Sequence, residues 1–131
     1  MKKIEVVAAI VINDGKILCV QRNENKYSYI SNKYEFPGGK IEEGETQKSA
    51  LLREIKEELN MDIDIQKEFL TVKHAYPDFH LTMHSYICTS TNNDVSLLEH
   101  IDYQWLDKSE LKHLDWAAAD IPIIECLQYD G

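Results

Sequence analysis

The chain has 131 residues, 44% of them hydrophobic and 28% charged, which suits one globular domain over residues 1–131 and is too short for two. A formal net charge of -9 argues against non-specific binding to nucleic acid, because the phosphate groups would be repelled. No apolar stretch approaches the length of a transmembrane helix, so we expect neither a nucleic-acid nor a membrane partner.

The first part of the chain predicts a β-hairpin. The apolar run 6–12 indicates a buried strand, and Asn13-Asp14-Gly15-Lys16 has the composition of a tight turn. Residues 17–21 make the returning strand, which leads into Arg22. Residues 23–33 are polar and aromatic without periodicity, which predicts a loop that bounds a cleft.

A glycine turn and an amphipathic helix follow. Pro37 restricts the backbone just before Gly38 and Gly39, and Thr46 is a good helix N-cap because its hydroxyl can accept from free amides of the first turn. Apolar side chains then recur at helical spacing and predict the buried face of the helix: Leu51, Leu52, Ile55 and Leu59.

Three carboxylates lie close together on this helix. At about 100° per residue, Glu54, Glu57 and Glu58 fall within roughly one third of the circumference, beside the buried face. Like charges so placed repel one another, and a solvated face balanced by Arg53 and Lys56 is one explanation. The other is a cation site, because carboxylate oxygens suit Mg²⁺ or Mn²⁺, which also bind phosphate oxygens.

The second half of the chain predicts strands and then helices. Alternating polarity indicates three strands: 63–74, 81–89 and 103–106. The end is helical, with a short segment over 108–113 and a longer one over 117–128 that has Pro122 in its first turns. This order predicts an α/β fold in which a central mixed sheet lies between the helix after Thr46 and the C-terminal helix.

The cysteines and histidines show no metal-ligand spacing. The cysteines lie in apolar stretches, which indicates buried, reduced thiols and favours the cytoplasm: Cys19, Cys88 and Cys126. The histidines are scattered, and we interpret each as structural: His74, His80, His84, His100 and His113.

The stretch from Gly39 to Met61 resembles the Nudix box, written G-x5-E-x7-REUxEExGU with U aliphatic. Gly39, Glu45 and the run Arg53-Glu54-Ile55-Lys56-Glu57-Glu58-Leu59-Asn60-Met61 match eight of its nine specified positions. The exception is Asn60 in place of glycine, and asparagine is the next-best residue for the left-handed conformation that ends a helix. A gapped pattern with this many charged positions is very specific, so the chain resembles the Nudix hydrolases.

That resemblance implies the Nudix α/β/α sandwich. Shorter matches resemble the MutT-type branch, which cleaves nucleoside triphosphates: Glu-Val-Val-Ala-Ala-Ile over 5–10, Glu35-Phe36-Pro37-Gly38-Gly39-Lys40, Pro77-Asp78, Gln104-Trp105-Leu106 and Ala119-Asp120-Ile121-Pro122. They imply a metal-dependent pyrophosphohydrolase that sanitises the nucleotide pool, with a small nucleotide as partner. Monomer and homodimer both stay open.

The resemblance also implies site residues. The metal would be Mg²⁺, with Mn²⁺ as an alternative. It would be bound by the carbonyl of Gly38 or Gly39 and by three carboxylates of the box: Glu54, Glu57 and Glu58. Arg53 would orient Glu54 and pair with Glu45. The family also uses a carboxylate outside the box as a metal ligand or a base for water, and Glu99, six residues before Trp105, is the best match. Arg53, Glu54, Glu57 and Glu99 are therefore the candidate catalytic residues.

Some of the expected substrate-binding residues would contact the phosphate groups, and the others would contact the base. Arg22 and Lys40 are the cations expected to take up phosphate charge. Phe36 matches the aromatic residue beside the base in MutT-type proteins, Asp120 stands where that pattern has an asparagine, and Phe79 stands where it has an arginine. An ionised carboxylate only accepts hydrogen bonds, so Asp120 suits the cytosine N4 amine and favours cytosine or modified pyrimidine nucleotides, with 8-oxo-dGTP secondary. Alternatively, Asp120 only caps the C-terminal helix.

Other functions stay open at this point. Pro77 lies near a proline of some ADP-ribose hydrolases, and Tyr76 near a tyrosine of dinucleoside polyphosphate hydrolases. A nucleotide-binding Nudix domain without turnover is a further alternative, although the intact glutamates favour an enzyme. The expected compartment is the cytoplasm.

Overall fold

The computed structural model describes residues 2–129, with side chains described up to residue 128. It contains seven strands: β1 (Lys2–Asn13), β2 (Lys16–Gln21), β3 (Tyr34–Glu35), β4 (Gly38–Lys40), β5 (Asp64–Ala75), β6 (Phe79–Thr89) and β7 (Asp102–Leu106). It also contains two α-helices and two 3₁₀ helices: α1 (Gln47–Leu59), η1 (Lys108–His113), η2 (Ala118–Asp120) and α2 (Ile121–Tyr129).

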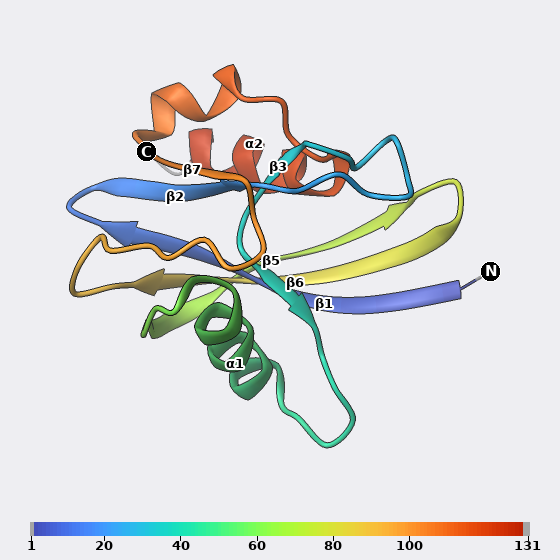
Figure 1. Cartoon of the computed structure of the whole chain (residues 1–131), viewed down its shortest axis with the longest axis horizontal. Helices are drawn as coiled ribbons and strands as arrows, with labels where there is room; N and C mark the ends of the chain where they lie inside the picture. The colour runs from blue at the N-terminus through green and yellow to red at the C-terminus, as the bar shows by residue number, and fades with distance from the viewer. Residues whose placement is uncertain (1, 130–131) are drawn as a thin grey trace.

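The strands form one mixed sheet with the order β3-β2-β1-β6-β5, in which β4 also pairs with β1 and β7 with β2. β1 runs parallel to β6, whereas the other strand pairings are antiparallel. Figure 1 shows α1 on one face of this sheet and α2 with η1 on the other. The predicted α/β architecture is therefore confirmed.

The central strand β1 explains how both faces are covered. Val7, Ala9 and Val11 belong to the apolar cluster that contains α1, whereas Ala8 and Ile10 belong to the cluster that contains α2. Alternate side chains of a strand point to opposite faces, so a strand covered on both sides has a continuous apolar run. The run 6–12 is the sequence signature of this two-sided burial.

The predicted hairpin turn is confirmed. Asn13 pairs with Lys16, which leaves a two-residue loop of Asp14 and Gly15 with φ angles of 52° and 77°. Positive φ at both loop residues is the conformation whose twist matches the flanking strands, and it explains the Asp-Gly pair.

Helix α1 begins and ends as predicted, but one side of its buried face differs. The Thr46 hydroxyl accepts from the backbone amide of Ser49, and Asn60 ends the helix in the left-handed conformation at φ 53° and ψ 40°. Leu52, predicted to be buried, is 45% exposed, and Ala50 is buried instead. The buried face of the helix is therefore rotated from the predicted one, away from Leu52 and toward Ala50.

Other differences concern the start of the C-terminal helix, short elements and one cysteine. The helix predicted over 117–128 is a 3₁₀ helix over Ala118–Asp120 and becomes α-helical only from Ile121. Strands β3 and β4 were not predicted, because segments of two and three residues show no periodicity and depend on pairing with β2 and β1. All three cysteines are free, but Cys126 is only partly buried, so the prediction of burial was wrong there. In the described part of the chain, no helix is long and apolar enough to cross a membrane.

Candidate active site

A cavity of about 560 Å³ opens between the sheet and the loops around it. Most of the predicted site residues line it: Arg22, Phe36, Gly38, Gly39, Lys40, Glu54, Glu58, Phe79, Glu99 and Asp120. Residues 23–25 and Ile30 also line it, so the loop 23–33 bounds a cleft as predicted. Arg53 and Glu57 are not among the lining residues, but Arg53 contacts Glu54, which is.

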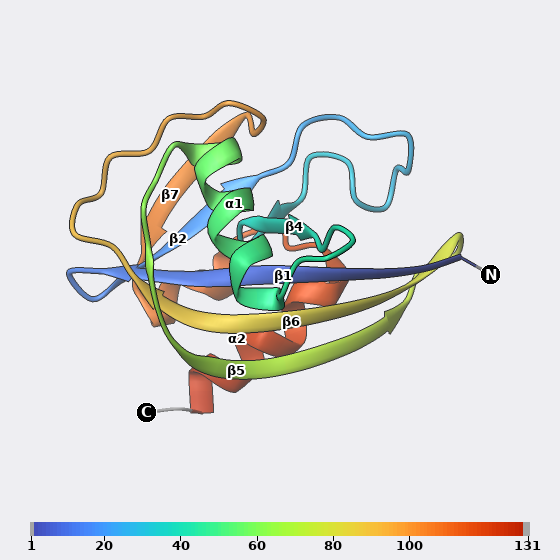
Figure 2. The ribbon, with the colours of Figure 1, turned by 90° about the horizontal axis from the view of Figure 1, so that it is seen from below.

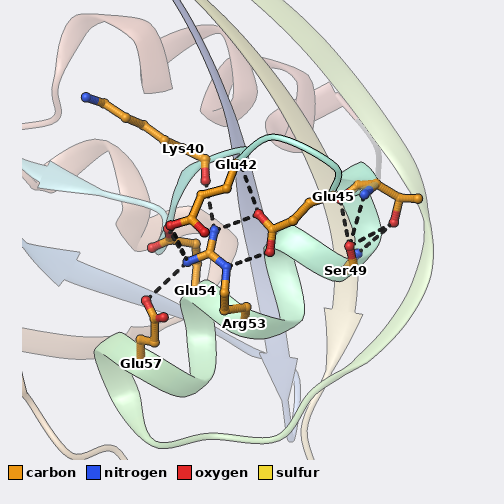
Figure 3. A network of polar contacts seen from close by, with 8 residues as sticks. Lys40, Glu42, Glu45, Ser49, Arg53, Glu54 and Glu57 are labelled. Carbon is orange, nitrogen blue, oxygen red and sulfur yellow. Dashed lines mark hydrogen bonds and ion pairs between the residues drawn. The ribbon is translucent and has the colours of Figure 1, made fainter.

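Arg53 joins the box loop to the helix (Figure 3). Its guanidinium donates to both oxygens of Glu45, at 2.6 and 2.8 Å, and to the carbonyl of Lys40 at 3.1 Å. The Nη1 atom also contacts Glu54 at 2.9 Å and Glu57 at 3.1 Å. The bidentate pair lowers the pKa of Glu45 to about 2, chiefly through the hydrogen bonds from Arg53. The structure therefore contains the predicted contacts of Arg53 with Glu45 and Glu54.

Gly38 and Gly39, at the start of the box, leave room for different neighbours. A Cβ on Gly38 would lie 1.9 Å from the carbonyl oxygen of Val7, in the central strand. A Cβ on Gly39 would lie 2.4 Å from Oε2 of Glu54. Gly38 is therefore required for strand packing, whereas Gly39 lets the Glu54 carboxylate lie against the backbone of β4.

Glu58 is the buried carboxylate of the site. It is 8% exposed, and its Oε1 atom is fully buried without a hydrogen-bond partner among the described residues. Burial, followed by the nearby charges of Glu35, Glu54 and Glu99, raises the pKa of Glu58 to about 9. An unpaired carboxylate oxygen facing other carboxylates fits the ligand chemistry of a hard divalent cation.

Not all of the predicted ligands converge. The described residues contain no ready-made group of three or more acidic, histidine or cysteine side chains that could hold a metal ion. The side chain of Glu57 is 57% exposed and contacts Arg53 instead. Glu99 is exposed, and the backbone amide of Leu98 next to it donates to the Glu58 carbonyl at 3.1 Å. The structure thus brings Glu54, Glu58 and Glu99 to one cavity and leaves Glu57 at its edge.

The pH dependence of stability tests the burial of Glu58. The carboxyl has an ordinary pKa of 4.5 and a folded-state pKa of about 9, so ionisation favours the unfolded state and its contribution to stability falls as pH rises across this window. With chelator present near pH 8, we expect Glu58→Gln to raise the free energy of unfolding by about 1–3 kcal/mol, as measured by urea denaturation. The gain should vanish near pH 4, and exposed Glu125→Gln is the control.

Glu35 and His100 are site residues that the sequence reading missed. Glu35 accepts from Arg22 Nη1 through Oε1 at 3.0 Å and contacts His100 Nε2 through Oε2 at 2.9 Å. All three side chains line the cavity. The position of Glu35 beside Phe36 and Pro37 was a usable signal, but nothing in the sequence pairs it with a histidine 65 residues away.

The other end of the cavity is apolar and contains one carboxylate. Phe36 is 2% exposed, and its ring lies 4.8 Å from that of Trp116. Asp120 is 4% exposed, and its Oδ1 accepts from the Phe36 amide at 3.0 Å. In the described part of the chain the carboxylate accepts from no amide of α2, so the helix-cap alternative is wrong. Burial, followed by the charge of Glu35, raises the pKa of Asp120 well above its ordinary value.

Comparisons with known proteins agree with this geometry. A family model described as "NUDIX domain" matches residues 6–126. The CTP pyrophosphohydrolase of Escherichia coli (strain K12) is 34% identical over 125 residues, 95% of this chain and 91% of the relative. The 8-oxo-dGTP diphosphatase of the same strain is 29% identical over 128 residues, 98% of each chain.

A solved structure resembles the whole chain. The solution NMR structure of the DNA mismatch repair protein MutT (family Nudix hydrolase) from methicillin-resistant Staphylococcus aureus 252 has a TM-score of 0.76 and 40% sequence identity, and the match covers 100% of both chains.

Proposed function

The chain belongs to the Nudix family, and from this premise we propose that it is a metal-dependent pyrophosphohydrolase of nucleoside triphosphates. Its products would be a nucleoside monophosphate and pyrophosphate, and its role the sanitation of the nucleotide pool. The observation that carries the proposal is the arrangement of Glu54 and Glu58 at the cavity, with Arg53 tying Glu54 to the box loop.

Nudix hydrolases generally use divalent metal ions, and we propose Mg²⁺ here. Glu54, Glu57, Glu58 and Glu99, with a glycine carbonyl of β4, would hold it. When bound, the ion would neutralise phosphate charge and lower the pKa of a water molecule. Support comes from the unpartnered Oε1 of Glu58, which lacks a counter-charge in the described residues.

Four side chains of the protein would assist the reaction besides binding the metal: Arg53, Glu99, Arg22 and Lys40. Arg53 holds Glu54 against Gly39, so this carboxylate enters the reaction already oriented. Glu99, on an exposed loop, is available as a further ligand or as a base for the attacking water. Arg22 and Lys40 line the cavity and offer positive charge to the phosphates. Figure 3 shows the Lys40 side chain extending away from the Arg53 cluster, which leaves its ammonium group available.

The base would be read by Asp120, with Phe36 forming the apolar wall beside it. Because Oδ1 is committed to the Phe36 amide, Oδ2 is the oxygen left for a ligand. A buried carboxylate is ionised at a cost unless a donor faces it, and the N4 amine of cytosine is such a donor. We therefore propose cytosine nucleotides, modified ones included, as preferred substrates and 8-oxo-dGTP as a secondary one.

Asp120→Asn tests this reading. The Asn oxygen should keep the hydrogen bond from the Phe36 amide, which turns the NH₂ group toward the ligand and replaces an acceptor by a donor. We expect the ratio of kcat/KM for dCTP over 8-oxo-dGTP to fall by about tenfold or more, since a mispaired buried polar group costs roughly 1–3 kcal/mol. An unchanged ratio, with an unchanged melting temperature, would refute base reading by Asp120.

A substrate panel tests the function itself. Pyrophosphate release should be measured with Mg²⁺ and with chelator for dCTP, CTP, 8-oxo-dGTP and the ordinary triphosphates. For ADP-ribose and dinucleoside polyphosphates, the release of nucleotide products should be measured by chromatography under the same two conditions. We expect metal-dependent release from triphosphates. Turnover of ADP-ribose alone would show that the protein is an ADP-ribose hydrolase. Tight binding of a nucleotide without turnover would show that it is a nucleotide-binding domain without catalytic activity. The reduced thiols and the proposed substrate pool lead us to propose a cytoplasmic location.

A further inference from the structure

We propose that His100 is a positioning residue, which places Glu99 at the cavity by anchoring the loop 90–101 to Glu35. The inference rests on the proposed function, since it concerns the carboxylate that would serve as a ligand or base. His100 itself needs no contact with the reacting atoms, because it acts through the loop that it holds.

The loop has one buried side chain. Every residue of 90–101 is described, and His100 alone among them is buried, with 4% of its side chain exposed. Glu99 and Ile101 on either side are exposed. Val95 and Leu97 also pack, partly buried, against the apolar cluster that contains α1. His100 is the buried side chain next to Glu99, so we expect the position of Glu99 to depend on how firmly His100 is held.

Two backbone hydrogen bonds flank the anchor. The Leu98 amide donates to the carbonyl of Glu58 at 3.1 Å, and the Ile101 amide donates to the carbonyl of Gln21 at 3.0 Å. Figure 2 shows the loop running from β6 past the C-terminal end of α1 to β7, in agreement with these contacts. The backbone is thus attached on both sides of residues 99 and 100, and His100 supplies the side-chain attachment between them.

Glu35 makes the anchor part of the site. One of its oxygens is paired with Arg22 and the other with His100, and only 15% of its side chain is exposed. The same carboxylate therefore connects a cation expected at the phosphates with the loop that carries Glu99. Loss of the histidine would leave one oxygen of Glu35 without a hydrogen-bond donor, close to Glu58, whose pKa the charge of Glu35 already helps to raise.

Only one of the two ring nitrogens of His100 has a hydrogen-bond partner among the described residues. With Nε2 donating to Glu35, the Nδ1 atom is fully buried and has no hydrogen-bond partner among the described residues. An unpaired buried polar atom is costly, and an apolar side chain of similar size would avoid that cost but would leave Oε2 of Glu35 without its donor. What the histidine adds is the directed contact with Glu35.

The test combines activity with metal binding. His100→Phe keeps the ring volume without a donor, and His100→Gln restores a donor to Glu35. Each is made alone and together with Glu99→Gln, and Mn²⁺ binding is titrated without nucleotide by electron paramagnetic resonance. Because partners that support metal ligands typically contribute 10–100-fold, we expect His100→Phe to weaken Mn²⁺ binding and lower kcat by about tenfold or more, with nucleotide KM within about threefold.

The rescue and the double variant separate positioning from general damage. His100→Gln should return both readouts to within about threefold of wild type, and His100→Phe should have no further effect in the Glu99→Gln background. His113→Phe, on exposed η1, is the matched control. If His100→Phe does not fold, His100→Asn takes its place, since its shorter amide cannot reach Glu35 in the same way.

Any of three results would overturn the inference. The first is wild-type affinity for Mn²⁺ in His100→Phe, and the second is the absence of rescue by His100→Gln. The third is that His100→Phe lowers kcat and Mn²⁺ affinity by the same factor in the wild-type and Glu99→Gln backgrounds. Wild-type protein that binds Mn²⁺ but hydrolyses no nucleotide would refute the proposed function alone, because the Mn²⁺ titration still decides the role of His100. Wild-type protein that binds no Mn²⁺ would refute both.

Discussion

Glu57→Gln should abolish turnover and leave the fold intact. Glu57 is the box carboxylate that lies at the edge of the cavity, and its side chain is 57% exposed. The neutral amide keeps the shape but removes a charge that the proposed metal site requires, so we expect kcat to fall by more than about a hundredfold. Steady-state kinetics at saturating Mg²⁺ measure this.

Stability should scarcely change, because Arg53 loses one partner and keeps Glu45 and Glu54. An exposed ion pair contributes about 0–1 kcal/mol, so we expect a melting temperature within about 2 °C of wild type. Exposed Glu125→Gln on α2 is the matched control for the loss of one charge. Turnover within about tenfold of wild type would contradict the metal-site assignment.

Gly38→Ala should have the largest effect on stability. The new Cβ would meet the Val7 carbonyl, and the atom in the way is backbone of the central strand, which cannot rotate aside. Relief requires β4 to move from β1, where Gly38 pairs with Ala8 and the neighbouring Pro37 carbonyl accepts from Ala9 at 2.8 Å. We expect a loss of about 3 kcal/mol or more in urea denaturation.

Gly39→Ala should affect activity instead. Its Cβ would meet the end of the Glu54 side chain, which can swing away, so we expect at least about a tenfold loss of kcat with a much smaller loss of stability. Gly44→Ala is the control, because Gly44 has φ +84° and open space around its Cβ position and should show only backbone strain of about 1 kcal/mol. Equal stability of the Gly38 and Gly39 variants would show that the close approach to Val7 is not limiting.

The local sequence determined most of the elements of this protein. Three local features depend only on neighbours a few residues away, so their residue types were sufficient to predict them. They are the hairpin at Asp14 and Gly15, the helix cap at Thr46 and the left-handed helix end at Asn60. The contacts of Arg53 with Glu45 and Glu54 were predicted from the resemblance to the Nudix box, which implied both.

Only the tertiary structure decided which side chains meet across the cavity. The contact of Asp120 with the Phe36 amide joins residues 84 positions apart, and that of His100 with Glu35 joins residues 65 apart. Leu52 was assigned to the wrong side of α1 for a related reason, since helical periodicity defines a stripe but not its orientation against the sheet. Long-range contacts depend on how strands and helices pack. A single sequence shows which side chains can form hydrogen bonds or ion pairs, but it does not show which of them come into contact.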